Sequence, residues 1–256
     1  LLATSYLARG EEVKAQKAME EAVDVSPKSV LRQRRLSSLA EKNKDMDTAL
    51  KASRKTIKLG QNSCFESPED YLHLTRQLAD ASKDDLSIQG KEHAKEAFDV
   101  LRRLEKKTYC DSTANLQSKS LKSRVSSGQH KDAEAQKWLD QAKAAYQDLE
   151  HNLSPDASID FAETLISSGE KDAAEGILKR VAKENEDNDR ITDKVDAISD
   201  GPVSKRGRTK VSEWTKKGIA HYEAKQYPDA VKVFCSSLEI FPNHVGLNLN
   251  LVQAVL

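Results

Sequence analysis

Apolar residues recur along this chain at the three- and four-residue intervals that place them on one face of an α-helix. The longest such stretch carries Trp138, Ala142, Ala145 and Leu149 at i, i+4, i+7 and i+11. No sustained alternation of β-branched and polar residues marks a strand. We therefore predict an all-α chain. The expected helices lie near residues 1–8, 11–25, 28–42, 45–59, 68–82, 90–107, 112–127, 130–150, 155–168, 171–184, 188–199, 210–224, 227–240 and 244–256.

Three of these helices are expected to start at a Ser-Pro pair, namely Ser26-Pro27, Ser67-Pro68 and Ser154-Pro155. A serine side chain can accept a hydrogen bond from the free amides of the first turn, and proline suits the first helical position. These pairs are therefore interpreted as helix starts and not as phosphorylation sites.

A spaced set of small and aromatic residues stands near the C-terminal end: Trp214, Gly218, Ala230, Phe234 and Pro242, in the pattern W-x3-G-x11-A-x3-F-x7-P. Small residues let two helices approach closely, aromatic residues fill the remaining space, and proline ends the second helix. The pattern resembles the tetratricopeptide repeat, a pair of antiparallel helices. It implies a solenoid of helix pairs that serves as a binding scaffold.

Further copies of the same gaps support a repeat. They are found at Ala3, Ala15 and Pro27, at Ser37 and Ala49, and at Ala162 and Ala174. The first two copies lie 34 residues apart, which is the period of a tetratricopeptide repeat. In the middle the period fails, because Thr75 is followed by Ala94 or Ala97, so we expect longer helix pairs there.

Glycines predict where one helix of a pair reverses into the next. Gly10, Gly128 and Gly169 each stand five residues before an alanine, namely Ala15, Ala133 and Ala174. Glycine adopts the left-handed backbone conformation that ends many helices. We expect a left-handed residue at each of the three glycines.

The expected organisation is a helical solenoid over 1–200, a basic flexible connection over 201–210, and a final helix pair with a capping helix over 211–256 of the same superhelix. The connection holds the densest basic run, Lys205, Arg206, Arg208 and Lys210. A solvated loop is favoured for this run over contact with phosphate or a membrane.

The composition of the chain argues against several classes of function. Of 256 residues, 41 are basic and 41 acidic, which argues against a general nucleic-acid binder because such proteins have a basic excess. No apolar stretch is long enough to span a bilayer, so no membrane contact is expected. The three cysteines are far apart and form no CxxC pair, which favours a reducing cytoplasm and no metal site.

No catalytic motif is present, so we expect no enzymatic activity and no cofactor. Gly90-Lys91 could suggest a phosphate-binding loop, but Asp85 replaces its first glycine and Glu92 its hydroxyl residue. The sequence has neither an HExxH motif nor a GxSxG motif.

Longer stretches of the chain resemble one family in particular. They are SPKSVLRQRRLSSLAEKN (26–43), TIKLGQNSCFESPEDYLHLTRQLAD (56–80), NEDND (185–189), KGIAHYEAKQYPDAVKVF (217–234) and PNHVGLNLNLVQAVL (242–256). They look like the C-terminal helical region of bacterial response regulators that join a CheY-like receiver domain to tetratricopeptide repeats. The resemblance implies an adaptor or output module of two-component signalling, with the receiver upstream in a longer polypeptide. No residue of this chain takes a phosphotransfer role.

A partner is expected to bind the inner surface formed by the first helix of each pair. The candidate groove residues are Arg34, Ser38, Glu41, Lys42, Leu72, Arg76, Ile159 and Glu163. They mix both charges with aliphatic side chains, which suits a peptide or a partner helix. The alternative for any one of them is a merely solvated side chain.

Two other functions stay open at this stage. The chain could be a structural scaffold whose apolar last helix, Val245 to Leu256, pairs with a second copy as a homodimer. Less favoured is an RNA-binding helical repeat, suggested by the basic run VSKRGRTK.

Overall fold

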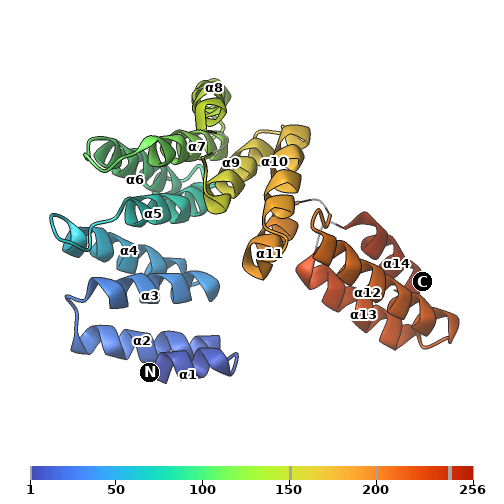
Figure 1. Cartoon of the computed structure of the whole chain (residues 1–256). Helices are drawn as coiled ribbons and strands as arrows, with labels where there is room; N and C mark the ends of the chain where they lie inside the picture. Colours follow the sequence, from blue (N-terminus) through green and yellow to red (C-terminus); the bar gives the residue numbers. More distant parts are fainter. Residues whose placement is uncertain (1, 150–151, 200, 242–243, 256) are drawn as a thin grey trace. The chain divides into compact units, whose positions relative to one another are not determined.

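The computed structural model describes residues 2–149, 152–199, 201–241 and 244–255, and over them every regular element is helical (Figure 1). The all-α prediction is confirmed. The helices are α1 (Leu2–Ala8), α2 (Glu12–Val25), α3 (Val30–Lys42), α4 (Met46–Gly60), α5 (Pro68–Ser82), α6 (Ile88–Glu105), α7 (Ser112–Gly128), α8 (Asp132–Leu149), α9 (Pro155–Ser167), α10 (Lys171–Glu184), α11 (Asp189–Ile198), α12 (Lys205–Glu223), α13 (Tyr227–Ile240) and α14 (Val245–Val255).

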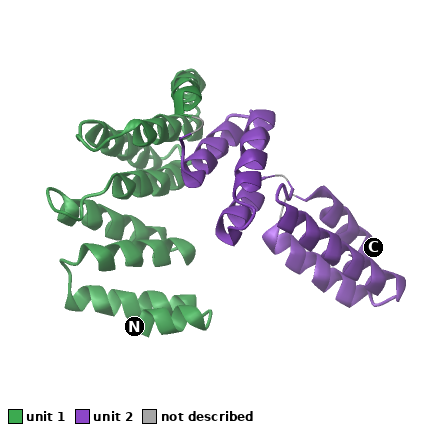
Figure 2. Cartoon of the chain, viewed as in Figure 1, with its two compact units in different colours: residues 1–151 green, residues 152–256 purple. Residues whose placement is uncertain are grey.

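The chain forms two compact units, residues 1–151 with α1 to α8 and residues 152–256 with α9 to α14 (Figure 2). In the first unit the helices pack as consecutive pairs, and each pair contacts the next. The second unit contains the pairs α9–α10 and α12–α13, with α11 between them and α14 packed on α13. Buried side chains group locally, for example Leu36 with Met19 and Ala52, as expected where each repeat contacts its neighbours.

Five helix pairs share one three-residue connection, over 9–11, 43–45, 129–131, 168–170 and 224–226. Its second residue is left-handed each time, at Gly10, Lys44, His130, Gly169 and Lys225, with φ between 55° and 83°. The amide of the third residue donates to a carbonyl in the last turn of the first helix, for example from Glu11 to Tyr6 at 3.0 Å. This is the hydrogen bond of a Schellman cap. The same turn therefore sets the same antiparallel geometry five times.

The small residues of the predicted repeat lie at fixed distances from this turn. One stands seven residues before the left-handed residue and an alanine five residues after it, giving Ala3/Ala15, Ser37/Ala49, Ser123/Ala135, Ala162/Ala174 and Gly218/Ala230. All ten are buried. Where the first member is serine, its hydroxyl donates to the backbone of the facing alanine, from Ser37 to Ala49 at 3.2 Å and from Ser123 to Ala135 at 2.9 Å.

The left-handed residue expected at Gly128 is wrong, and the structure places it at His130. Gly128 is the last residue of α7 and meets the preceding loop: its carbonyl accepts from the Asp84 amide at 2.9 Å, and a Cβ would lie 3.2 Å from the Lys83 Cα. The helix partner is accordingly Ala135, whereas Ala133 is exposed. Here glycine serves close approach and not a positive φ.

The pair α5–α6 departs from the common turn, and its helices of 15 and 18 residues agree with the longer pairs expected in this region. Its connection runs from Lys83 to Ser87, and the Gln129 side chain donates to the carbonyls of Ser82 at 2.6 Å and Asp85 at 3.1 Å. Gln129 thus satisfies backbone acceptors that a short turn would have satisfied itself.

Two predicted helix starts are confirmed and one is wrong. Ser67 and Ser154 cap α5 and α9, each followed by proline in the first turn. At Ser26-Pro27 the expected start fails, because Ser26 ends α2 and Ser29 caps α3 three residues later. Pro27 is exposed in the link between these helices.

The flexible connection expected over 201–210 is wrong from Lys205 onward, where α12 already begins. The carboxylate of Asp196, at the end of α11, accepts from the Val203 amide at 2.9 Å, the Ser204 amide at 2.8 Å and the Ser204 hydroxyl at 2.5 Å. Asp196 is 3% exposed. A buried carboxylate with three donors fixes the helix start, which composition alone could not indicate.

The last signature pair places Gly218 of α12 against Phe234 of α13. A Cβ on Gly218 would lie 2.3 Å from the Phe234 Cζ, and Phe234 is 1% exposed. Trp214 is half-buried and packs at 6.0 Å between ring centroids against Phe241. Pro242, the last signature residue, lies outside the described residues.

Gly218→Ala is expected to destabilise the chain by about 1–3 kcal/mol, because the added methyl group must displace a buried ring. Gly176→Ala in α10 is the matched control, since nothing lies within 4 Å of its Cβ. This control should gain up to about 1 kcal/mol from helix propensity. Urea unfolding followed by far-UV circular dichroism measures both, and equal effects would contradict the close contact.

Candidate protein-binding face

Two neighbouring first helices of the first unit, α3 and α5, each carry a row of side chains that are exposed or half-buried. Each row follows the helical spacing i, i+4, i+7, i+11. We call the set the α3–α5 face; it comprises Leu31, Arg35, Ser38 and Lys42 of α3, and Glu69, His73, Arg76 and Asp80 of α5. Both charges and an aliphatic group, Leu31 at 55% exposure, lie on it.

An ion pair joins the two helices beside this face. Arg34 binds both carboxylate oxygens of Asp70, with an Nε–Oδ1 and an Nη–Oδ2 distance of 2.7 Å each. It also donates to the Phe65 carbonyl. The Asp70 side chain is 8% exposed and that of Arg34 32%. The planar guanidinium thus fixes α3, α5 and the loop before α5 together.

A buried polar network lies under the face. The Ser37 hydroxyl is 2.6 Å from that of Ser53, and the Ser53 hydroxyl is 2.8 Å from the Gln77 amide oxygen. The Gln77 amide nitrogen is 2.9 Å from Ser37 and 3.1 Å from His73. Ser37, Ser53 and Gln77 are each at most 3% exposed. Because buried polar groups tolerate few alternative arrangements, the network fixes the register of α3, α4 and α5.

The structure separates five of the candidate groove residues of the first unit into three kinds. Ser38 and Lys42 are exposed on the α3–α5 face. Arg76 belongs to the face but is half-buried, 2.6 Å from Glu69, and Glu41 is half-buried beside the face, 3.6 Å from His73. Arg34 is engaged in the ion pair described above, so its role here is structural.

The prediction that Leu72 and Ile159 line the groove is wrong. They were expected in the groove, but Leu72 is 1% exposed and Ile159 0%, so each belongs to the core of its unit. The error is one of register, because the solvent-facing row of α5 begins at Glu69 and passes one position from Leu72. Glu163, in the second unit, is half-buried on α9.

A carboxylate ties two loops at one end of the first unit. Glu66 accepts from Tyr71 at 2.8 Å and from the Asn62 amide at 2.9 Å, and lies 2.9 Å from the Lys107 ammonium. Its side chain is 10% exposed. Burial opposes ionisation, yet the Lys107 ammonium and the other donors outweigh it and lower the pKa of Glu66 to about 2. Burial and the same carboxylate raise the pKa of Tyr109.

The basic run of α12 is largely neutralised within the second unit. Arg206 pairs with Asp189 of α11 at 2.5 Å, and Lys210 pairs with Asp193 at 3.1 Å. This arrangement agrees with neither a solvated loop nor a free phosphate site. The acids of α11 were the missed signal, since their spacing of four matches that of the two basic residues.

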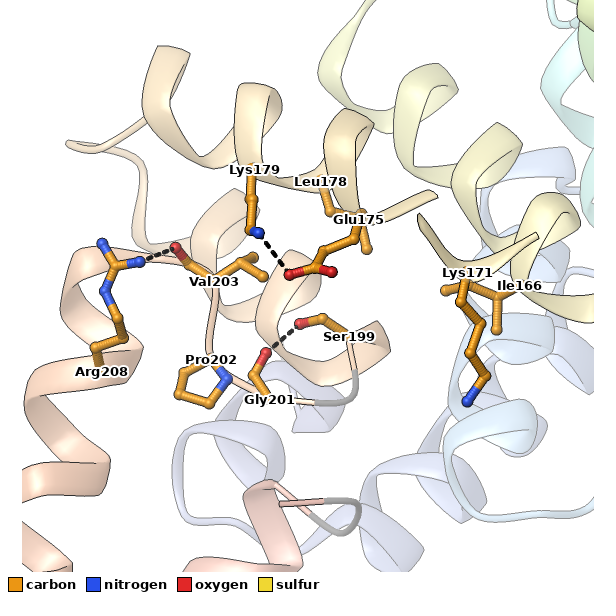
Figure 3. A pocket seen from close by; sticks show the side chains of 10 residues that line it. All are labelled: Ile166, Lys171, Glu175, Leu178, Lys179, Ser199, Gly201, Pro202, Val203 and Arg208. Carbon is orange, nitrogen blue, oxygen red and sulfur yellow. Dashed lines mark hydrogen bonds and ion pairs between the residues drawn. The ribbon is translucent and has the colours of Figure 1, made fainter. Parts of the chain in front are cut away.

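A pocket of about 250 Å³ lies in the second unit, between the end of α9, α10 and the link from α11 to α12 (Figure 3). Leu178 and Val203 contribute apolar groups to it. Figure 3 shows Lys179 directed at Glu175, 2.6 Å away, and Arg208 donating to the Val203 carbonyl at 3.1 Å. Because these polar groups are already paired, the pocket offers few free groups for a ligand.

Other kinds of site find no support in the described part of the chain. No three His, Cys, Asp or Glu side chains there come together as metal ligands would. None of its helices is long and apolar enough to cross a membrane.

Comparison with known proteins identifies the fold. A family profile described as Tetratricopeptide repeat matches residues 125–194. The chain resembles the crystal structure of TTC0263, a thermophilic tetratricopeptide-repeat protein of Thermus thermophilus, with a TM-score of 0.52 and 17% identity over 77% of this chain and 95% of that one. The fold is that of tetratricopeptide repeats.

Weaker structural likenesses extend over more of the sequence. A Rap protein complexed with Competence and Sporulation Factor is 12% identical over 99% of this chain and 72% of its own, with a TM-score of 0.49. YrrB, a tetratricopeptide-repeat protein with an unusual peptide-binding site, is 13% identical over 94% and 98%, with a TM-score of 0.35. No curated protein matches the sequence.

Arg34→Ala is expected to lower the free energy of unfolding by about 2 kcal/mol, since it leaves the Asp70 carboxylate buried without its cation. Arg35→Ala, one position along on the exposed row, should change it by less than about 0.5 kcal/mol. Urea denaturation compares the two, and indistinguishable losses would show that the ion pair does not stabilise α3 on α5.

Glu66→Gln is expected to remove a pH-dependent share of stability. The folded pKa of about 2 lies below the ordinary 4.5, so ionised Glu66 stabilises above pH 4.5 and that contribution fades as the pH falls toward 2. The variant should lose about 2 kcal/mol near neutral pH and progressively less in acid. Unfolding of both proteins across this range checks the sign, and a constant difference would contradict it.

Proposed function

We propose that this chain is a non-catalytic protein-interaction module that binds its partner through the α3–α5 face. Repeats of this kind commonly present extended binding surfaces made of successive helices. The observation that carries the proposal is the pair of solvent-facing rows above a fixed polar network. A rigid backbone with open side chains costs little ordering on binding, which favours recognition of a peptide or a partner helix.

We further propose that the module is the output part of a bacterial two-component response regulator working in the cytoplasm. The sequence stretches 26–43, 56–80 and 217–234 support this reading through their resemblance to such proteins. In that arrangement an upstream receiver domain takes the phosphoryl group, and the repeats determine which protein receives the signal. Three free cysteines accord with a reducing compartment.

Photo-crosslinking tests the partner surface. A benzophenone amino acid replaces Ser38, at the centre of the α3–α5 face, in the full-length polypeptide within its own cells. We expect a crosslinked protein, identified by mass spectrometry, whose yield falls about tenfold when Arg35→Glu and Lys42→Glu are added. Arg34 is left intact because its replacement would disturb the fold.

The matched control carries the benzophenone at Lys51, an exposed position of α4 outside the face. Equal adducts from both positions would contradict a specific surface. Repeating the experiment with the phosphoryl-accepting residue of an upstream receiver replaced tests the signalling proposal separately, since an unchanged yield would remove receiver control and leave partner binding intact.

A homo-oligomeric scaffold is the second candidate, and α14 favours it. Leu247 and Ala254 are buried against α12 and α13, yet the opposite side is also apolar. There Val245 is 70% exposed, Leu249 60%, Val252 55% and Val255 67%. Leu256, also counted in the expected dimer helix, lies outside the described residues. Light scattering of the chain and of its Leu249→Glu variant decides: a dimer that the variant abolishes supports the scaffold, and a monomer in both excludes it.

A further inference from the structure

A second recess lies in the first unit on helices that the α3–α5 face does not use. It has a volume of about 560 Å³ and is bounded by α6, the end of α7 and the start of α8. Ala94 and Val125 form a buried floor, at 6% and 1% exposure. Phe98 is half-buried beside them, and Leu86 projects from the preceding loop at 51% exposure. The recess thus presents apolar surface to solvent.

Basic side chains surround this apolar floor. Four of them, Lys91, Lys95, Arg102 and Lys131, face two acidic residues, Asp99 and Glu134. Arg102 is 3.2 Å from Asp99 and Lys131 is 4.0 Å from Glu134, so both acids are engaged.

The two lysines of α6 that line the recess differ from Arg102 and Lys131 because they have no acidic partner in the part of the chain that the structure describes. Lys91 and Lys95 are exposed and have no ion-pair partner among the described residues, and both line the recess. They stand four residues apart, hence on one side of the helix and about one turn apart. In a chain with 41 basic and 41 acidic residues, two neighbouring cations without partners beside an apolar recess are a local excess.

We propose that this recess is a second docking site, for an acidic peptide segment of a partner protein that carries one large apolar side chain. The apolar side chain fills the space over Ala94 and Val125, where it contacts Phe98 and Leu86. Carboxylates of the same segment pair with Lys91 and Lys95. Because α6 and α8 are second helices of their pairs, this site and the α3–α5 face are formed by different helices.

The apolar floor and the basic rim together favour an acidic segment with an apolar anchor over other kinds of peptide. A basic segment would be repelled by Lys91 and Lys95 at the rim, and an acidic segment without an apolar anchor would gain only exposed ion pairs, which contribute little. An uncharged apolar segment would leave the two lysines unpaired and gain no electrostatic steering. Only an acidic segment with an apolar anchor uses both features.

Fluorescence anisotropy with the whole chain tests the site. The probe is a short labelled peptide with a central Phe flanked by Glu residues. Its comparison peptides carry Lys in place of Glu, or Ser in place of Phe. We expect binding of the first peptide alone, weakening as salt is raised.

Protein variants locate the binding. Lys91→Glu with Lys95→Glu should weaken binding by about tenfold or more, because two attractive contacts become repulsive. The matched control is Lys51→Glu with Lys55→Glu on α4, which makes the same charge change at the same spacing away from the recess. Leu86→Ser, on an exposed loop, should weaken binding several-fold without affecting the helices, as circular dichroism would verify.

Several outcomes would overturn the proposal. Equal losses in the two lysine pairs would mean non-specific charge attraction, and unchanged binding by Leu86→Ser would mean that the apolar side chain does not enter the recess. Binding of a fatty-acid anion at the recess without binding of the peptide would replace the peptide by a small amphiphile. None of these results bears on Ser38 crosslinking, so this site and the α3–α5 face can fail independently.

Discussion

Everything in this chain depends on how closely two helices of a pair can approach. The shared turn determines the direction of the second helix, and the small residue facing an alanine determines the distance. Gly218 against Phe234 shows this constraint, since a Cβ at Gly218 would lie only 2.3 Å from the Phe234 Cζ. Where a serine takes the small position, its hydroxyl is bonded across the contact, so a polar residue is accommodated without an unpaired group.

Because the helix pairs are held by small and apolar residues, charged side chains can form ion pairs between different helices and loops. Arg34 with Asp70 and Glu66 with Lys107 join segments far apart in sequence, and Arg206 with Asp189 joins the consecutive helices α12 and α11 of the second unit. A formal charge of zero therefore does not describe an evenly mixed surface. Many charges are paired within the protein, so the total charge does not show which charged groups are available to a partner.

The fold was largely predictable because apolar residues recur along a helix at intervals of three and four residues. All the expected helices are present, and most ends agree within two residues, since caps and turns are local in sequence. The failures have a different origin. Gly128 has the residue type of a left-handed turn, but its close approach to Lys83 explains the glycine, and His130 takes the left-handed position.

The binding face was less predictable than the fold. Ser38 and Lys42 are open as expected, whereas Leu72 and Ile159 are core residues, because a one-position error in register turns a helical side chain by about 100°. The ion pair of Arg34 could not be predicted, since 36 residues separate it from Asp70.

Helix pairs that contact only their neighbours can in principle open one at a time. Gln129 changes this for the first unit, because its amide bonds to Ser82 and Asp85, more than 40 residues earlier in the chain. Opening of α5–α6 would leave two backbone carbonyls and the Gln129 amide without their hydrogen bonds, and α7–α8 would lose its closest neighbour. The Gln129 side chain thus adds a hydrogen-bonded link to the apolar core that the two helix pairs share, so opening one pair costs hydrogen bonds in the other.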